Sequence, residues 1–183
     1  MKIAITGHTK GIGKGLYDFY KKKGHIVCGF SRSNGFDIEK KSDEIIKKTK
    51  DYDIFFNNAY NGFYQVKLLF NLWEQWYNKE KLIINISSII CQTSYPYKYH
   101  KFFSKYKIHK LSLNKAVKEL QQTPSKCQVS LISPGSVKTD FTPKISRDKS
   151  ILNINEIIEV ANLIVIKRKK FRIHNITYKG CYI

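Results

Sequence analysis

The stretch Lys2-Ile3-Ala4-Ile5-Thr6-Gly7-His8-Thr9-Lys10-Gly11-Ile12-Gly13 decides the fold. A short apolar run meets a glycine-rich turn, and Ile12, Leu16 and Phe19 then follow with helical spacing. Glycines permit a tight turn, and the backbone N–H groups at the start of the following helix can approach a pyrophosphate. The stretch therefore predicts a strand, a phosphate-binding turn and a helix.

Buried strands and amphipathic helices alternate along the rest of the chain. Apolar runs bounded by turn residues lie at 2–6, 25–30, 53–57, 82–87, 129–133 and 171–178, with helical spacing between them. Strands that are apolar on both faces and separated by helices predict a parallel sheet. We therefore expect an α/β fold, a Rossmann-like doubly wound parallel sheet of about six to seven strands with helices on both faces, which binds its ligand beyond the carboxyl ends of the strands.

Length and composition predict one domain over residues 1–183, since 42% of the residues are hydrophobic. The start has no signal-peptide core, and lysines interrupt every apolar run before the roughly twenty residues that a membrane span needs. The four cysteines and five histidines show no metal-ligand spacing. These features predict a cytoplasmic protein with reduced thiols, no metal site, no membrane segment and no membrane as a partner.

The net charge of +19 raises the hypothesis of nucleic-acid binding, because clustered cations neutralise phosphates. The lysines are spread along the whole chain, however, which indicates a general compositional bias. The run 167–170 follows a helix, where cations complement the negative end of the helix dipole. We therefore do not expect nucleic acid to be the specific partner.

Four ordered motifs carry a resemblance to a known family. The first motif, Thr6-Gly7 to Gly13, has the form Thr-Gly-x-x-x-Gly-x-Gly, and the second, Asn57-Asn58-Ala59-Tyr60, is similar to Asn-Asn-Ala-Gly. The third, Ile84-Asn85-Ile86-Ser87-Ser88, is similar to a strand that ends in a catalytic serine. The fourth, Pro134-Gly135-Ser136-Val137-Lys138-Thr139, is similar to Pro-Gly-x-Val-x-Thr. Together they resemble the short-chain dehydrogenase/reductase family over nearly the whole chain. Tyr60 departs from the pattern, because it replaces a glycine.

The resemblance implies a nicotinamide dinucleotide site. Its residues would be Gly7, Thr9, Lys10, Gly11, Ile12 and Gly13 of the turn, Asp37 and Ile38 beside the adenine, Asn58, Ala59 and Tyr60, Tyr106 and Lys110, and Pro134, Gly135, Val137 and Thr139 beside the nicotinamide. At the end of the second strand, Ser31-Arg32-Ser33 stands where an NAD enzyme would carry a carboxylate. A guanidinium and Lys10 suit a 2′-phosphate, so NADP is favoured over NAD.

Tyr106 and Lys110 are four residues apart at the start of a helical segment, so both side chains lie on one helix face. A phenol is a poor acid at neutral pH, and an adjacent ammonium lowers its pKa. The resemblance makes them catalytic together with Ser88, and makes Asn61 the nearest match to an asparagine that holds a water. Tyr97 with Lys101 has the same spacing and remains an alternative.

The chain also departs from the family in length. Only residues 33–36 separate Arg32 from Asp37, so one crossover should be missing, and the segment from Asp140 to Asn153 leaves little room for a substrate lid. We therefore predict a compact NADP(H)-dependent oxidoreductase that acts on a small carbonyl or alcohol, with a reduced or open pocket. The rival hypotheses are an NADPH-binding module with little or no turnover and, after it, a basic nucleic-acid-binding protein. A homodimer or homotetramer is expected by analogy, through the helices that contain residues 66–73 and 113–120.

Overall fold

The computed structural model describes residues 1–92, 100–140 and 151–181, with the backbone alone at residues 100–103. Within these ranges six strands form one parallel sheet in the order β2-β1-β3-β4-β5-β6. The strands are β1 (Lys2–Thr6), β2 (Ile26–Phe30), β3 (Ile54–Asn57), β4 (Leu82–Ile86), β5 (Gln128–Pro134) and β6 (Asn175–Tyr178). The helices are α1 (Gly11–Lys22), α2 (Ser42–Lys48), α3 (Tyr64–Trp76), α4 (His100–Gln122) and α5 (Ile154–Lys167).

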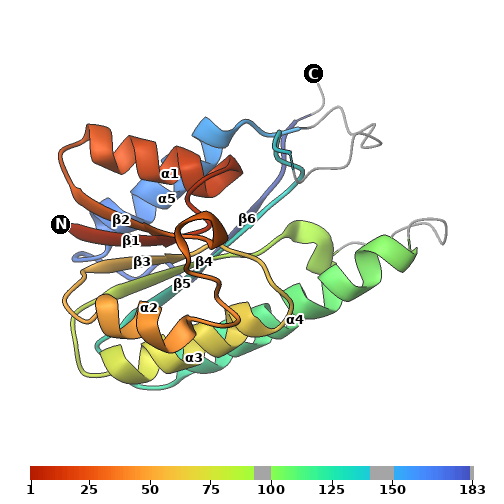
Figure 1. The fold of residues 1–183 in the computed structure, drawn as a ribbon. Coiled ribbons are helices and arrows are strands. Elements are labelled where there is room, and N and C mark those ends of the chain that lie inside the picture. The colour runs from red at the N-terminus through yellow and green to blue at the C-terminus, as the bar shows by residue number, and fades with distance from the viewer. Residues whose placement is uncertain (93–99, 141–150, 182–183) are drawn as a thin grey trace.

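Helices cover both faces of the sheet (Figure 1). Helices α1 and α5 pack together on one face, and α2, α3 and α4 lie on the other. Each strand contributes side chains to the core on both faces of the sheet, because successive side chains point to opposite faces. Ile3 and Ile5 are buried under α1 and α5, whereas Ala4 faces the other three helices. The predicted Rossmann-like doubly wound sheet is confirmed.

The predicted loss of one crossover is also confirmed. The common doubly wound order 3-2-1-4-5-6 places a third strand outside the second. Here β2 lies at the edge of the sheet, and the chain passes from β2 to β3 through a 3-10 helix (Arg32–Asn34) and α2 alone. The missing strand leaves the outer edge of β2 without a neighbouring strand among the described residues.

Two boundaries differ from those that the sequence predicts. The last strand begins at Asn175 instead of residue 171, because the chain is still leaving α5 there: Phe171 N–H bonds the Lys167 carbonyl at 3.2 Å, and the Arg172 guanidinium reaches the Ser125 carbonyl at 2.8 Å. The other boundary is the start of α4 at His100, which places Tyr106 in the second turn of that helix.

Candidate functional site

The glycine turn between β1 and α1 has the geometry of a phosphate-binding turn. Gly7 and Gly11 adopt positive φ angles of 71° and 53°, which disfavour any side chain. A Cβ on Gly13 would lie 2.1 Å from the Gly7 carbonyl oxygen, so the first turn of α1 packs directly on the loop. The N–H groups that open α1 therefore lie at the carboxyl edge of the sheet, where a helix N-terminus favours an anion. Thr9 and Lys10 are exposed on this turn, and Ile12 is half-buried.

Thr6 and Asn58 tie the ends of β1 and β3 together. The Thr6 hydroxyl oxygen accepts hydrogen bonds from the N–H groups of Asn58 and Ala59, both at 3.0 Å. The Asn58 amide donates to the Thr6 carbonyl at 3.0 Å. Sequence reasoning gave Thr6 no role of its own. A hydroxyl residue at the end of a fully buried strand is the signal that could have identified it.

The end of β2 forms a small polar loop beside the glycine turn. Gly7 N–H bonds the Phe30 carbonyl at 2.7 Å, which holds the two loops together. The Ser31 N–H bonds Asn34 Oδ1 at 2.8 Å, and the hydroxyls of Ser31 and Ser33 lie 2.8 Å apart. The Arg32 side chain is exposed. The loop therefore presents a guanidinium at the same edge as Lys10.

Asp37, Ile38 and Asn61 form a second group on this edge. Ile38 is buried, and Asp37 Oδ1 accepts from the Glu39 N–H at 2.8 Å. The Asn61 amide donates to Glu39 Oε2 at 3.1 Å and approaches Asp37 Oδ1 at 3.4 Å. The structure therefore places the Asn61 amide against carboxylates, and none of the hydrogen bonds of the described residues joins it to Lys110.

Lys110 lies at the carboxyl end of β4. Its amine donates to the Ile86 carbonyl at 2.8 Å and to Gln65 Oε1 at 2.9 Å, and the side chain is almost fully buried. Burial lowers the pKa of this ammonium from 10.5 to about 7, because the charged form loses its hydration. The site therefore holds an amine that can exchange its proton near neutral pH.

Gln65 is a second residue of the site, after Thr6, that the sequence did not predict. Its amide N–H donates to the Asn57 carbonyl at 2.7 Å, and the Asn57 amide donates back to the Gln65 carbonyl at 2.9 Å and to Asn85 Oδ1 at 2.9 Å. The network joins β3, α3, β4 and α4 around Lys110. A glutamine beside the apolar positions of α3 gives no sequence signal that it is buried.

Tyr106 and Tyr60 flank Lys110. The two rings pack edge to face at 4.9 Å between centroids, and the Lys110 amine lies 5.6 Å from the centre of the Tyr106 ring. Tyr60, which replaces the family's glycine, has its hydroxyl 2.8 Å from His109 Nδ1. An aromatic group that the sequence did not predict therefore stands beside the predicted catalytic pair. The alternative Tyr97 lies outside the described residues, as does the side chain of Lys101.

Ser88 lies two residues beyond the end of β4, so it shares the sheet edge with Lys110. Its hydroxyl oxygen accepts the Ile90 N–H at 3.3 Å. The neighbouring Ser87 is buried instead, and its hydroxyl donates to Asn114 Oδ1 of α4 at 2.5 Å. Of the two serines, Ser88 is the one that is partly exposed at the site.

The segment that follows β5 lies at the carboxyl edge of the sheet, beside the glycine turn. Gly135 N–H bonds the Tyr178 carbonyl at 2.7 Å, and buried Val137 bridges to Leu152. A Cβ on Gly11 would lie 3.3 Å from the Thr139 methyl group, so Thr139 reaches the glycine turn. Pro134 is buried at the end of the strand. Most of the segment from Asp140 to Asn153, which the sequence predicts to be too short for the usual substrate lid, lies outside the described ranges, at residues 141–150.

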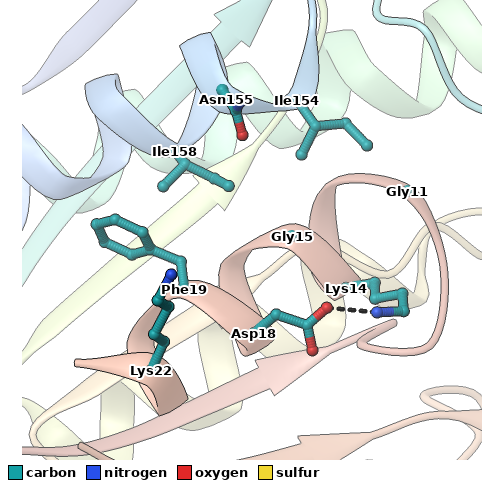
Figure 2. Close-up of a pocket in the computed structure, with 9 residues that line it drawn as sticks. All are labelled: Gly11, Lys14, Gly15, Asp18, Phe19, Lys22, Ile154, Asn155 and Ile158. Atoms are coloured by element: carbon teal, nitrogen blue, oxygen red, sulfur yellow. Dashed lines mark hydrogen bonds and ion pairs between the residues drawn. The ribbon is translucent and has the colours of Figure 1, made fainter. Parts of the chain in front are cut away.

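A groove of about 500 Å³ lies between α1 and α5 (Figure 2). It touches the predicted cofactor turn only at Gly11, and its walls include Phe19, Ile154 and Ile158. Lys14 and Asp18, which also line it, form an ion pair. The groove therefore lies on the face of the sheet that α1 and α5 cover, whereas Lys110 belongs to α4 on the other face. No group of metal-ligating residues occurs among the described residues.

Lys110 predicts a pH dependence of stability. Between pH about 7 and the ordinary pKa of 10.5, the unfolded chain binds a proton that the folded protein does not. The contribution of Lys110 to the free energy of unfolding should therefore rise with pH in this window, by at most about 1.4 kcal/mol per pH unit. Below this pH window the amine is charged in both states, so the folded protein bears the full cost of burying the charge. We expect urea unfolding between about pH 7 and 9 to show this rise in the wild type and a flatter profile in Lys110→Met; above that range the raised pKa of the buried Cys127 thiol acts in the opposite direction. Parallel profiles would contradict the assignment.

Comparison with solved structures finds dehydrogenases and reductases over the whole chain. An alcohol dehydrogenase from Thermococcus sibiricus, complexed with 5-hydroxy-NADP, matches with a TM-score of 0.79 at 19% identity, covering 100% of this chain and 98% of that one. A 3-ketoacyl-(acyl-carrier-protein) reductase from Brucella melitensis, complexed with NADH, matches with a TM-score of 0.79 at 18% identity, covering 96% of each chain. A 4-hydroxyisoleucine dehydrogenase complexed with NADH has a TM-score of 0.80 at 16% identity, covering 99% of this chain and 98% of that one.

No protein-family model matches the sequence, and no curated protein matches it. The likeness therefore rests on the backbone, with sequence identities below one fifth. Among the matching structures is one described as a short-chain dehydrogenase in complex with NADP. The chain has the fold of the short-chain dehydrogenases and reductases that its four motifs resemble.

Proposed function

We propose that this chain is an NADP(H)-dependent short-chain oxidoreductase, a single domain that transfers hydride between the nicotinamide and a small carbonyl or alcohol. The observation that carries the proposal is Lys110, a buried amine held at the end of β4 and one helical turn from Tyr106. Ser88 lies on the same edge of the sheet as the glycine turn. The cofactors named for the matching structures support a nicotinamide dinucleotide.

The residues at this edge fit a dinucleotide. The absence of a Cβ at Gly13 brings the start of α1 onto the Gly7 carbonyl, which leaves N–H groups at the helix N-terminus for a pyrophosphate. Asp37 and Ile38 would lie beside the adenine, and Val137 and Thr139 would line the nicotinamide side. When bound, the nicotinamide supplies the hydride.

Two cations support NADP over NAD. Arg32 and Lys10 are both exposed at the carboxyl edge, where a 2′-phosphate would bind. Ser31 and Ser33 stand where a carboxylate would bond the ribose of NAD. Their hydroxyls bond each other, so the loop is held in shape around Arg32.

Each catalytic side chain has a separate task. Ser88 would donate a hydrogen bond to the substrate oxygen, and Tyr106 would give that oxygen a proton during reduction. Lys110 would bond the ribose with the N–H that Gln65 and Ile86 leave for it. Gln65 would hold the amine in place. Asn61, the sequence candidate for holding a water, has its amide on Glu39 and Asp37 instead. Tyr60 and His109 narrow the space beside Tyr106, which favours a small substrate.

Arg32→Ala tests the cofactor preference. Loss of a charged hydrogen bond to a phosphate costs about 2 kcal/mol, so NADPH should bind about thirtyfold more weakly while NADH binding changes little. Isothermal titration calorimetry measures both, with Lys118→Ala as the control for loss of a distant exposed charge. An equal loss for both cofactors would contradict the role in 2′-phosphate binding, and no binding of either by the wild type would overturn the proposed function.

Tyr106→Phe tests the chemistry. Loss of the phenolic proton should lower turnover of a carbonyl panel by about a hundredfold or more, while NADPH still binds. Tyr64→Phe on the adjacent helix is the matched control. Full activity in Tyr106→Phe would point to Tyr97. NADPH binding by the wild type without turnover of any substrate would favour a binding module over an enzyme.

We further propose that the chain forms a homodimer through α3 and α4. Phe63, Phe70, Ile108 and Leu111 are exposed on or beside these helices, with 54%, 37%, 55% and 43% of their surface accessible. Exposed apolar side chains on adjacent helices are typical of an interface. Light scattering should give the mass of a dimer for the wild type and of a monomer for the double variant Ile108→Asp, Leu111→Asp. A monomeric wild type would contradict the proposal.

A further inference from the structure

The end of the molecule opposite the cofactor turn gathers cations from two helices. Helices α1 and α5 lie side by side and both end near the N-terminus of the chain (Figure 1). Lys21, Lys22 and Lys23 are exposed at the end of α1. The run Lys167–Phe171 leaves the end of α5, where Lys169 and Lys170 are exposed. Two lysine runs that are far apart in the sequence therefore lie at the same, amino edge of the sheet.

The imidazole of His25 lies among the positive charges of this edge. Ile26 N–H bonds the Met1 carbonyl at 3.1 Å, which places the chain start next to the end of α1. Burial lowers the pKa of His25, and the positive charges of the N-terminal ammonium, Lys23 and Arg168 lower it further. Cations of α1, of α5 and of the chain start thus act on one imidazole.

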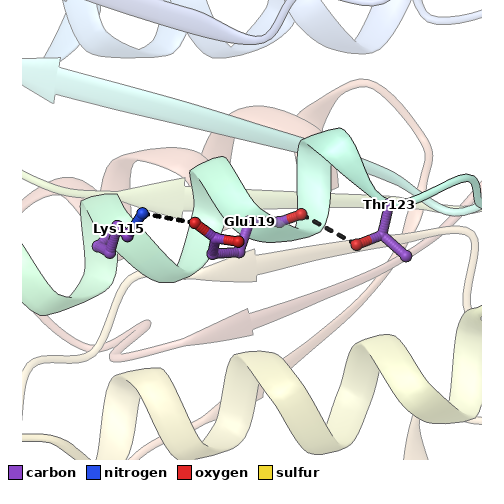
Figure 3. Close-up of polar contacts among 3 residues, drawn as sticks. All are labelled: Lys115, Glu119 and Thr123. Atoms are coloured by element: carbon purple, nitrogen blue, oxygen red, sulfur yellow. Dashed lines mark hydrogen bonds and ion pairs between the residues drawn. The ribbon is translucent and has the colours of Figure 1, made fainter.

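The described acidic side chains form no ion pair with the two lysine runs. Asp18 of α1 is paired with Lys14. Asp53, directly before β3 at the amino edge, accepts the Lys2 N–H at 2.7 Å, and Glu156 lies at the far end of α5. No salt bridge between described residues includes a member of either lysine run. Helix α4 differs, because its exposed Lys115 bonds Glu119 at 2.5 Å (Figure 3).

The helix dipoles account for only part of the charge. Each helix C-terminus carries about half a negative charge, so two termini offset roughly one cation. The two runs supply seven, from Lys21–Lys23 and from residues 167–170. Arg168 caps its own helix through the Val165 carbonyl, which leaves the lysines as excess charge. An excess of this size favours an anionic partner.

Large apolar side chains are exposed beside these lysines. Leu163 and Ile166 face solvent on the second half of α5, 42% and 58% accessible, and Phe171 directly after Lys170 is 53% accessible. Phosphate groups of a nucleic acid gain little from exposed leucine and isoleucine. The boundary between lipid headgroups and acyl chains binds such side chains together with lysines.

We propose that this end of the molecule, termed the basic end (Lys21–Lys23, Leu163, Ile166 and Lys167–Phe171), binds the surface of an anionic membrane. The lysines contact the headgroups, and the three apolar side chains enter the interface. Binding is peripheral, since none of the described helices is long and apolar enough to cross a membrane. The glycine turn lies at the opposite edge of the sheet, so the proposed cofactor site stays accessible from solvent.

Vesicle sedimentation with the full chain tests the proposal. The probes are vesicles of phosphatidylcholine alone and of phosphatidylcholine with phosphatidylserine. The wild type should sediment with the anionic vesicles only, and raised salt should weaken binding. The double variant Lys169→Gln, Lys170→Gln should bind about fivefold more weakly for each lysine removed. Lys115→Gln with Lys118→Gln on α4 is the matched control and should bind as the wild type does.

Ile166→Ser separates a membrane from a nucleic acid. The substitution removes apolar surface and no charge, so it should weaken vesicle binding severalfold and leave binding to a duplex DNA oligonucleotide unchanged. Failure to bind anionic vesicles, equal binding to neutral vesicles, or DNA binding that prevails over vesicles and ignores Ile166→Ser would each overturn the proposal. NADPH titration of the same variants reports on the cofactor site independently.

Discussion

The hydrogen bonds that join Thr6 to Asn58 and Ala59 hold together the part of the molecule on which the site depends. β1 lies between β2 and β3, and its carboxyl end carries the glycine turn. A single buried hydroxyl oxygen accepts two N–H groups from the end of β3, so the turn cannot move relative to the central strands without leaving buried polar groups unpaired. Gly13 then allows the first turn of α1 to pack directly on this loop, because a Cβ at this position would clash with the Gly7 carbonyl oxygen.

A second constraint is the polar network inside the sheet and helix layer. Asn57, Asn85 and Gln65 are buried and bond one another or neighbouring carbonyls, and Lys110 joins them through Gln65. Burying an amine is costly, and the lowered pKa of Lys110 expresses that cost. The acceptors that reduce it come from α3 and β4. The position of this amine is therefore set by four elements at once, which suits the role in cofactor binding that we propose for it.

The lost crossover shapes the molecule in two ways. β2 becomes an edge strand, and the Asn34 amide covers its Gly29 carbonyl at 2.9 Å, which reduces the exposed hydrogen-bonding edge. His8 packs where a Cβ of Gly29 would lie, which closes the loop beside the turn. Both faces of the shorter sheet are nevertheless covered by helices. The carboxyl edge carries the proposed site and the amino edge carries the basic end, so the two surfaces face opposite ways.

The sequence by itself determined the α/β order, the glycine turn after the first strand, the absent crossover and the placement of Tyr106 and Lys110 one helical turn apart. These depend on local signals: glycines that need positive φ, strands apolar on both faces, and side chains four residues apart on one helix face. Tertiary structure alone decided that Gln65 holds Lys110, that Asn61 faces carboxylates, that Tyr60 packs on Tyr106 and that two distant lysine runs lie at the same edge of the sheet. A hydrogen bond or a charge cluster between residues forty or more positions apart depends on how strands and helices pack, and no pattern within a short window of sequence records that packing.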